Sequence, residues 1–330
     1  MSALTVVTYH YVRDLSRTRY PGLKACTVGD FEGQLDYIRR YYRVVGARDV
    51  VAAARGERTL GANACLLTFD DGLLDHYTTV FPCLIERGLT ASFYPPVATV
   101  EGRRVLDVHK IQIILAAARD VGKLARQILD MMEEYRRGWE LPAAESFYRE
   151  HAQPYMFDPP EVGFVKRVLQ RVLPEPVRAA ITARLFEEYV GDPEEVVVKE
   201  LYMDLPQLRA MAWHGMEVGG HGARHVWLDA LPPAEQEREI ALTVEFLGRV
   251  YLRPPQDWVM CYPFGSYNND TLAMLRAAGC ALGLTSRQGL ANLSTPLELL
   301  RLDVTDLPMR GDAPLSEWTA RVLAAETPHG

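Results

Sequence analysis

The sequence predicts an α/β protein whose parallel sheet or barrel is interrupted by a long helical segment. Three observations support this fold class. Short apolar, β-branched runs alternate with helical stripes from residue 4 to about residue 98. The pattern becomes purely helical over 105–198 and returns to alternating strands and helices after residue 204. Such alternation is typical of parallel sheets, because a crossover helix must return the chain to the edge from which the next strand starts.

The elements before the helical segment follow from hydrophobic periodicity. Residues 4–9 are an apolar, β-branched run, which predicts the first strand. A helix is expected over 31–41, and Thr27 with Asp30 resembles a capping box in front of it. The other elements predicted for this part are strands at 42–46, 64–67 and 91–94 and helices at 49–54 and 79–87.

The remaining elements divide the chain into two regions. We expect a barrel formed by 1–100 and 201–330, and a helical insertion or cap over 101–200. The insertion is predicted to contain helices at 111–132, 161–172 and 176–190. The elements predicted after it are helices at 204–214, 233–252, 269–278 and 316–325 and strands at 216–218, 258–262, 281–285 and 299–304.

Composition excludes several classes of protein. The 330 residues, 48% of them hydrophobic, suffice for one large core. A net charge of -7 argues against a nucleic-acid partner. The five cysteines contain no CxxC pair and suggest reduced thiols. The first ten residues lack a signal-peptide pattern, and no apolar run is long enough for a membrane span. We therefore expect a cytoplasmic protein; its oligomeric state cannot be read from the sequence.

Two adjacent carboxylates follow the strand predicted at 64–67. Residues 68–72 read Thr-Phe-Asp-Asp-Gly, and Gly72 allows a sharp turn. Because side chains alternate along an extended strand, Asp70 and Asp71 are predicted to point in different directions. One carboxylate can then bind a metal while the other stays free as a base. Taken alone, the segment favours a solvated turn over a site.

Two further segments could contribute to a site. His221 and His225 are four residues apart, which would place both imidazoles on one face of a helical turn. With a carboxylate from another strand end, they would form a two-histidine, one-carboxylate metal set that leaves positions open for water and substrate. Residues 262–267 contain Pro and Gly after a predicted strand. This turn can aim a backbone N–H at an oxyanion, or it can be an ordinary loop.

These three elements, in this order, resemble the polysaccharide deacetylase family (NodB-like, carbohydrate esterase family four). Residues 68–72 match the family's first motif, T-F-D-D-G, in full. Residues 221–225 match the histidines of the second motif, H-[ST]-x-x-H, with Gly222 in place of Ser or Thr. Of the third motif, R-x-P-[YF]-G, only 263–265 match. The resemblance covers roughly 4–98 and 202–305 and leaves out the helical insertion.

The resemblance implies a distorted (β/α)7 TIM-like barrel that binds Zn²⁺ or another divalent transition metal. By motif position, the metal ligands would be Asp71, His221 and His225, and Asp70 would be the general base for the attacking water. The third motif would contact the substrate and its oxyanion, the latter through the Phe264 N–H. Its residues here are Tyr262, Pro263, Phe264 and Gly265.

The chain departs from the family pattern at the arginine of the third motif, which is Cys261 here. In the family, that arginine holds the catalytic aspartate in place. Arg301, at the end of a predicted late strand, is the candidate replacement. A surface salt bridge is the alternative role for this residue.

The general acid is the second departure. Many family members use a histidine of a late L-x-H motif, but after His225 this chain has only His329, in its terminal tail. His10 is the first candidate, because the first and last strands of a closed barrel are neighbours. His76, just past the first motif, is the second. A structural role remains open for both.

We therefore expect a metal-dependent hydrolase of carbon–nitrogen bonds other than peptide bonds, which removes an acetyl group from the nitrogen of an amino sugar. The substrate would be a small molecule or oligosaccharide used in surface-polysaccharide or glycoconjugate assembly. One alternative is an amidase that acts on a cyclic or linear non-sugar amide. The other is a non-catalytic carbohydrate-binding relative that has lost its acid.

Overall fold

The computed structural model describes residues 4–324 except 62, 103 and 155–157. The chain forms two compact units. The barrel unit comprises Met1–Asp14, Ala25–Arg104 and Val198–Gly330, and the helical unit comprises Leu15–Lys24 and Val105–Val197. Residues 15–24 therefore group with the helical unit, although the sequence analysis assigned them to the barrel.

The barrel unit is built on a parallel sheet of eight strands. Seven strands follow one another in the order β5-β4-β3-β1-β8-β7-β6, and β2 pairs with β3 outside this order. The strands are β1 Thr5–Tyr9, β2 Arg43–Val44, β3 Ala64–Asp70, β4 Ser92–Tyr94, β5 Glu217–Val218, β6 Trp258–Cys261, β7 Cys280–Gln288 and β8 Leu299–Asp303.

The two ends of this strand order are joined through one residue. The Gly220 N–H donates to the Val259 carbonyl over 2.9 Å, and the Gly220 carbonyl accepts from the Cys261 N–H over 2.8 Å. The sheet thereby curls into a small barrel, as the fold class predicts. The carboxyl ends of its parallel strands consequently meet at one rim, where barrel folds place their chemistry.

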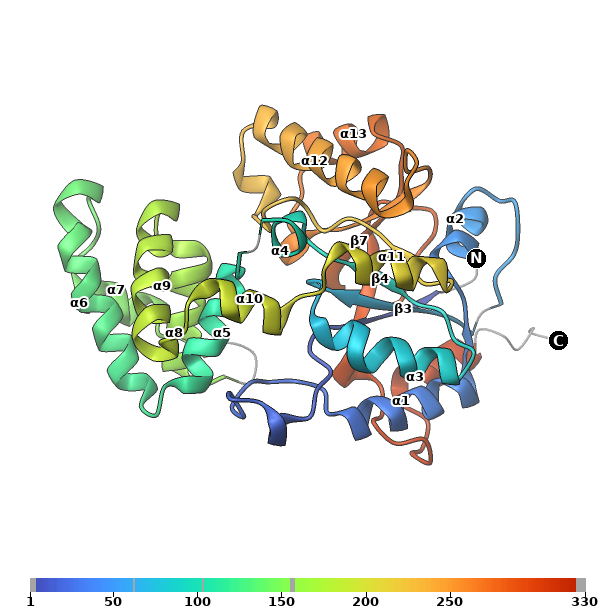
Figure 1. The fold of residues 1–330 in the computed structure, drawn as a ribbon, viewed down its shortest axis with the longest axis horizontal. Coiled ribbons are helices and arrows are strands. Elements are labelled where there is room, and N and C mark those ends of the chain that lie inside the picture. Colours follow the sequence, from blue (N-terminus) through green and yellow to red (C-terminus); the bar gives the residue numbers. More distant parts are fainter. Residues whose placement is uncertain (1–3, 62, 103, 155–157, 325–330) are drawn as a thin grey trace. The chain divides into compact units, whose positions relative to one another are not determined.

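Within the barrel unit, α1 and α3 lie on one side of the strands and α12 and α13 on the other (Figure 1). The helices of this unit are α1 Val28–Tyr41, α2 Ala47–Ala54, α3 Phe81–Glu86, α4 Val97–Val100, α11 Leu205–Trp213, α12 Pro233–Tyr251, α13 Asn269–Ala277 and α14 Glu317–Ala324. The predicted cap of the first helix is confirmed, since the Thr27 hydroxyl accepts from the Asp30 N–H over 3.1 Å.

The segment between Val105 and Leu201 is helical, as predicted, but one boundary was wrong. Its helices are α5 Asp107–Ala117, α6 Val121–Trp139, α7 Ala144–His151, α8 Pro160–Arg167, α9 Glu175–Val190 and α10 Glu194–Leu201. The single helix predicted at 111–132 is interrupted before Val121, because the Asp120 side chain accepts from the Lys123 N–H over 2.9 Å and starts a new helix. In the described part of the chain, no helix has the length and apolarity that a bilayer crossing requires.

Alternation along β3 decides which side chains reach the inside of the barrel. Phe69 is fully buried and lies between the rings of Tyr9 and Phe93, at centroid distances of 4.8 and 4.9 Å. These three residues occupy the same level of neighbouring strands and pack toward the helices. Thr68 and Asp70 therefore face the opposite way, into the barrel.

The aromatic stack should be a major source of stability. Phe69→Ala is expected to lower the free energy of unfolding by about 3–5 kcal/mol, because it leaves a cavity between two rings. Ile85→Ala is the matched control, since Ile85 on α3 is 45% exposed and its loss should cost within about 0.5 kcal/mol. Urea denaturation measures both variants, and equal effects would contradict the packing described here.

Candidate active site

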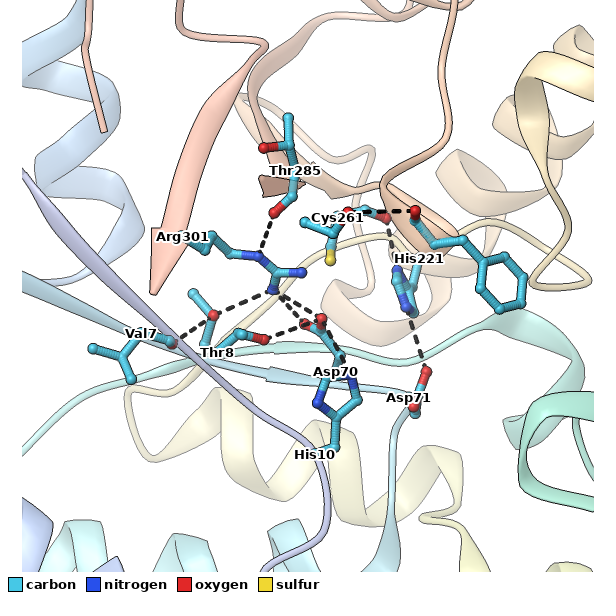
Figure 2. A network of polar contacts seen from close by, with 12 residues as sticks. Val7, Thr8, His10, Asp70, Asp71, His221, Cys261, Thr285 and Arg301 are labelled. Atoms are coloured by element: carbon cyan, nitrogen blue, oxygen red, sulfur yellow. Dashed lines mark hydrogen bonds and ion pairs between the residues drawn. The ribbon is translucent and has the colours of Figure 1, made fainter. Parts of the chain in front are cut away.

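The backbone turns sharply where β3 ends. Asp71 and Gly72 both adopt left-handed conformations, with φ of 72° and 69°. The left-handed conformation is unfavourable for a residue with a Cβ, so at Asp71 the surrounding contacts must maintain it. The two carboxylates consequently meet different partners, Asp70 an arginine and Asp71 a pair of histidines. Figure 2 shows Arg301 beside Asp70 and His221 beside Asp71.

Asp70 forms a buried ion pair with Arg301. The Arg301 Nη1 atom lies 2.8 Å from Oδ2 and 3.0 Å from Oδ1 of Asp70, and the two residues are 5% and 2% exposed. Burial by itself would raise the pKa of Asp70. The positive charge of Arg301, with smaller contributions from His221 and His10, more than offsets burial and holds this pKa below its usual value.

Arg301 is itself held in position. Its Nε donates to the Thr285 carbonyl on β7 over 2.8 Å, and a hydroxyl of β1, Thr8 Oγ1, donates to Asp70 over 3.3 Å (Figure 2). The surface salt bridge considered for Arg301 is therefore wrong, because the side chain is enclosed by β-strands. Arg301 takes the place that the sequence analysis assigned to the missing third-motif arginine, next to Asp70.

Asp71, His221 and His225 converge on one point. Asp71 Oδ1 lies 3.4 Å from the Nε2 atom of each histidine. Three ligand atoms bound to zinc at about 2.0–2.1 Å with tetrahedral angles are separated by about 3.3 Å, so the spacing suits such an ion. The set contains two nitrogens and one oxygen, which are ligands of zinc and similar divalent metals.

The orientation of His221 also fits a metal. Its Nδ1 atom lies 2.7 Å from the Cys261 carbonyl oxygen, which can only accept a hydrogen bond (Figure 2). Nδ1 must therefore carry a hydrogen, which leaves Nε2, the ring nitrogen nearer Asp71, as the atom that would ligate a metal in its unprotonated form. A second group of donor atoms, from Asp70, His221 and Cys261, also lies within 4.8 Å. It suits a cation less well, because the Arg301 charge already neutralises Asp70.

The histidine segment differs from the predicted helical turn. Residues 221–225 form an irregular loop, in which Gly222 has a φ of 71° and His225 a φ of 56°. The two rings are brought together by this left-handed backbone, with centroids 4.8 Å apart. The two rings therefore lie together, as the four-residue spacing predicted, but the helical turn expected between them is wrong.

Glu239 on α12 also contacts this loop and was missed by the sequence analysis. Its side chain is 1% exposed, and its carboxylate accepts hydrogen bonds from the loop backbone. One signal in the sequence could have found it. Glu239 lies on the same face of α12 as the buried residues Gln236, Ile240 and Thr243.

The turn after β6 places Phe264 beside the histidines. Phe264 is left-handed with a φ of 57°, and its ring lies 4.6 Å from the His225 ring and stacks on Trp227 at 4.5 Å. Tyr262 is 1% exposed, and its hydroxyl donates to the Leu297 carbonyl. This buried side chain holds the residue that precedes the turn in place. A Cβ at Gly265 would lie 2.0 Å from Ser286 Oγ, which explains why the turn needs glycine there.

The two acid candidates lie in different surroundings. His10 has a side chain that is 48% exposed, and its Nε2 lies 4.0 Å from Asp70 Oδ2 (Figure 2). His76 is fully buried, its Nε2 lies 2.8 Å from the His10 carbonyl oxygen, and it packs against Phe69 and Phe93. Burial lowers the pKa of His76 to about 4, so this residue has the properties of a structural histidine.

Comparisons with known proteins agree with the motifs. Residues 181–283 match the family described as polysaccharide deacetylase. YxkH of Bacillus subtilis, whose name assigns it provisionally to the polysaccharide deacetylases, is 30% identical over 86 residues. That segment is 26% of this chain and 30% of YxkH, so the chain matches less than a third of this curated relative. The resemblance predicted from the sequence is confirmed.

Solved structures confirm the fold. The deacetylase PplD of Streptococcus pyogenes, in complex with acetate, superposes with a TM-score of 0.59 at 16% identity over 99% of each chain. IcaB from Ammonifex degensii superposes with a TM-score of 0.55 at 18% identity over 99% of this chain and 98% of that one. At these identities the likeness confirms the predicted (β/α) barrel but does not show the chemistry.

The buried ion pair should be needed for stability. Arg301→Met is expected to lower the free energy of unfolding by about 3–5 kcal/mol, because it leaves the Asp70 carboxylate buried without its partner. Arg287→Met is the control. Arg287 is 58% exposed and pairs with Glu298 at 3.4 Å, so its loss should cost at most about 1 kcal/mol. Urea denaturation of both variants tests this difference, and similar losses would refute it.

Proposed function

We propose that this chain, a relative of the polysaccharide deacetylases, is a metal-dependent hydrolase that removes the acetyl group from the nitrogen of an amino sugar. The observation that carries the proposal is the pair of adjacent carboxylates with separate partners. Asp71 faces two histidine nitrogens at 3.4 Å, and Asp70 faces Arg301 at 2.8 Å. One carboxylate is thus arranged for a cation and the other for a proton.

Asp71, His221 and His225 would hold the metal. A divalent ion bound there would act as a Lewis acid toward the acetamide carbonyl and increase the acidity of water. Zn²⁺ is the first candidate, because the donor set has two imidazoles and one carboxylate. The hydrogen bond from His221 to the Cys261 carbonyl would hold the ring with its hydrogen on Nδ1, so that Nε2 is the nitrogen left to bind the metal.

Asp70 would act as the general base. The ion pair with Arg301 keeps its pKa low, so the carboxylate is ionised at neutral pH and can accept a proton from the attacking water. Arg301 and Thr8 also fix the orientation of the carboxylate. The Phe264 backbone N–H is the proposed donor to the oxyanion that forms on the acetyl carbonyl oxygen.

His10 is the proposed general acid. When the carbon–nitrogen bond breaks, the sugar nitrogen needs a proton, and the products are acetate and the free amine. His10 combines a partly exposed ring with a position 4.0 Å from Asp70, so it can reach both solvent and a substrate bound beside the base. His76 is less suitable, because it is buried and bonded to the His10 carbonyl.

The amino-sugar substrate is supported by the similar proteins. PplD is a deacetylase solved with acetate, and YxkH is named after polysaccharide deacetylation. The Phe264 and Trp227 rings beside His225 add an aromatic surface of the kind that packs well against the apolar face of a sugar. A cytoplasmic location and a substrate from glycoconjugate assembly remain predictions from the sequence.

Asp70→Asn should abolish activity without removing the metal. Acetate release from N-acetylated amino-sugar oligomers is expected to fall at least about 100-fold, because the amide cannot accept the proton of water. Zinc content, measured by mass spectrometry, should stay at the wild-type level, since Asp71 provides the carboxylate ligand.

Asp36→Asn is the control for this experiment, because Asp36 lies on α1 with a side chain that is 58% exposed and should be neutral in the assay. Wild-type turnover in Asp70→Asn would contradict the assignment of the base. A wild type that carries metal, leaves every amino sugar intact and hydrolyses ring amides would instead favour the amidase alternative.

His10→Ala should slow amide hydrolysis selectively. Turnover of N-acetyl substrates is expected to fall about 100-fold or more, whereas an aryl acetate should be affected far less, because a phenolate leaves without a proton. His214→Ala controls for loss of an exposed histidine elsewhere. If His10→Ala retained wild-type turnover on the amide, the acid would have to be another group.

A further inference from the structure

The loop that joins the two proposed histidine ligands depends on bonds to other elements. Residues 221–225 are neither helix nor strand, and two of them have positive φ angles. A loop of this kind keeps ligand atoms in place only when its backbone donors and acceptors are satisfied from outside. Such partners are therefore candidates for residues that act on the metal through its ligands.

A single buried carboxylate takes up two of the loop's donors. Oε2 of Glu239 accepts from the Ala223 N–H over 2.8 Å and from the Arg224 N–H over 2.9 Å. Oε1 accepts from the Arg224 Nε over 2.5 Å. All three bonds are charge-assisted, and the Glu239 carboxylate is 1% exposed, whereas the Arg224 side chain is half exposed.

The other side of the loop is bonded to α4. The Gly222 carbonyl accepts from the Val97 N–H over 3.2 Å, and the Ala223 carbonyl accepts from the Ala98 N–H over 2.8 Å. The loop is thus held between α12, which provides the acceptor, and the first turn of α4, which provides the donors. Each contact lies within the barrel unit.

Gly222 allows this close approach. A Cβ at this position would lie 3.3 Å from Pro263 Cγ and 3.5 Å from Glu239 Oε2, on a backbone with a φ of 71°. A Cβ would be crowded by Pro263, while its distance from the carboxylate would be an ordinary van der Waals contact. Glycine also has no side-chain hydroxyl to cap the loop, so the acceptor must come from elsewhere.

We propose that Glu239 is a positioning residue, which holds residues 222–224 so that His221 and His225 direct their Nε2 atoms at Asp71. The proposal rests on the metal site described under Proposed function. Without the carboxylate, the backbone N–H groups of Ala223 and Arg224 lose their shared acceptor at the buried side of the loop, and the half-exposed Arg224 side chain loses one of its two carboxylate partners. The loop would then relax, and the two histidines would no longer be preorganised for a metal.

Cobalt binding by the full chain tests this role. Glu239→Gln preserves the volume of the side chain but removes the charge and one acceptor oxygen. Its affinity for Co²⁺, measured by calorimetry, should be about 10- to 100-fold lower than that of wild type. The visible absorption spectrum of bound Co²⁺ should also change, because it reports the geometry of the ligands.

Glu235→Gln is the matched control. Glu235 is on the same helix and contacts the same Arg224 at 3.3 Å, but through an exposed side-chain pair. The Co²⁺ affinity and the Co²⁺ absorption spectrum of Glu235→Gln should equal those of wild type. Glu239→Asp retains the charge but withdraws the carboxylate by one methylene group, so it should also bind Co²⁺ more weakly. It serves as the second variant if Glu239→Gln fails to fold.

The outcomes separate this inference from the proposed function. If wild type and a folded Glu239 variant bind Co²⁺ with the same affinity and spectrum, the positioning role is wrong and the metal site stands. If wild type binds no divalent cation, the metal site and the positioning role both fail. Loss of affinity in the Glu239 variants together with unchanged binding by Glu235→Gln supports the proposal.

Discussion

The buried ion pair between Asp70 and Arg301 is the interaction on which the rest of the site depends. It joins residues 231 positions apart in the chain. The Arg301 Nε also donates a hydrogen bond to the Thr285 carbonyl. Three strands, β3, β8 and β7, are thereby connected at one level of the barrel. Because this pair uses the first carboxylate of the Asp-Asp segment, only the second is left for a cation. The proposed division of roles between the two neighbouring aspartates follows from the position of Arg301.

Left-handed backbone conformations also help to place these side chains. Asp71, His225 and Phe264 all have φ angles between 56° and 72°, although none is glycine. Each of these residues belongs to a different motif, and each sits where its side chain meets the others. Unfavourable backbone of this kind persists only where neighbouring contacts impose it, and it clusters at functional sites. At this rim, the hydrogen bonds that the loop donates to Glu239 and the packing of Pro263 and Gly265 are such contacts.

Local patterns in the sequence were sufficient to predict the barrel and to identify the residues that converge at its rim. Hydrophobic periodicity located the strands, and the order of three motifs indicated Asp71, His221 and His225, which the structure brings together. The geometry of the histidine loop could not be predicted, because four-residue spacing is equally compatible with a helical turn and with a left-handed loop. Glu239 was missed because its place on the apolar face of α12 indicates burial and nothing more. Its backbone partners, Ala223 and Arg224, cannot be read from the residue types.

Anomalous diffraction from crystals grown with zinc would test the central claim most directly. The account predicts one ion at the rim of the barrel, bound by Asp71 Oδ1 and by Nε2 of His221 and His225 at about 2.0–2.2 Å. Asp70 should stay paired with Arg301 and should not coordinate the ion. An ion bound by Asp70, or a fully loaded crystal with no zinc between the two histidines, would contradict the separation of the two carboxylates.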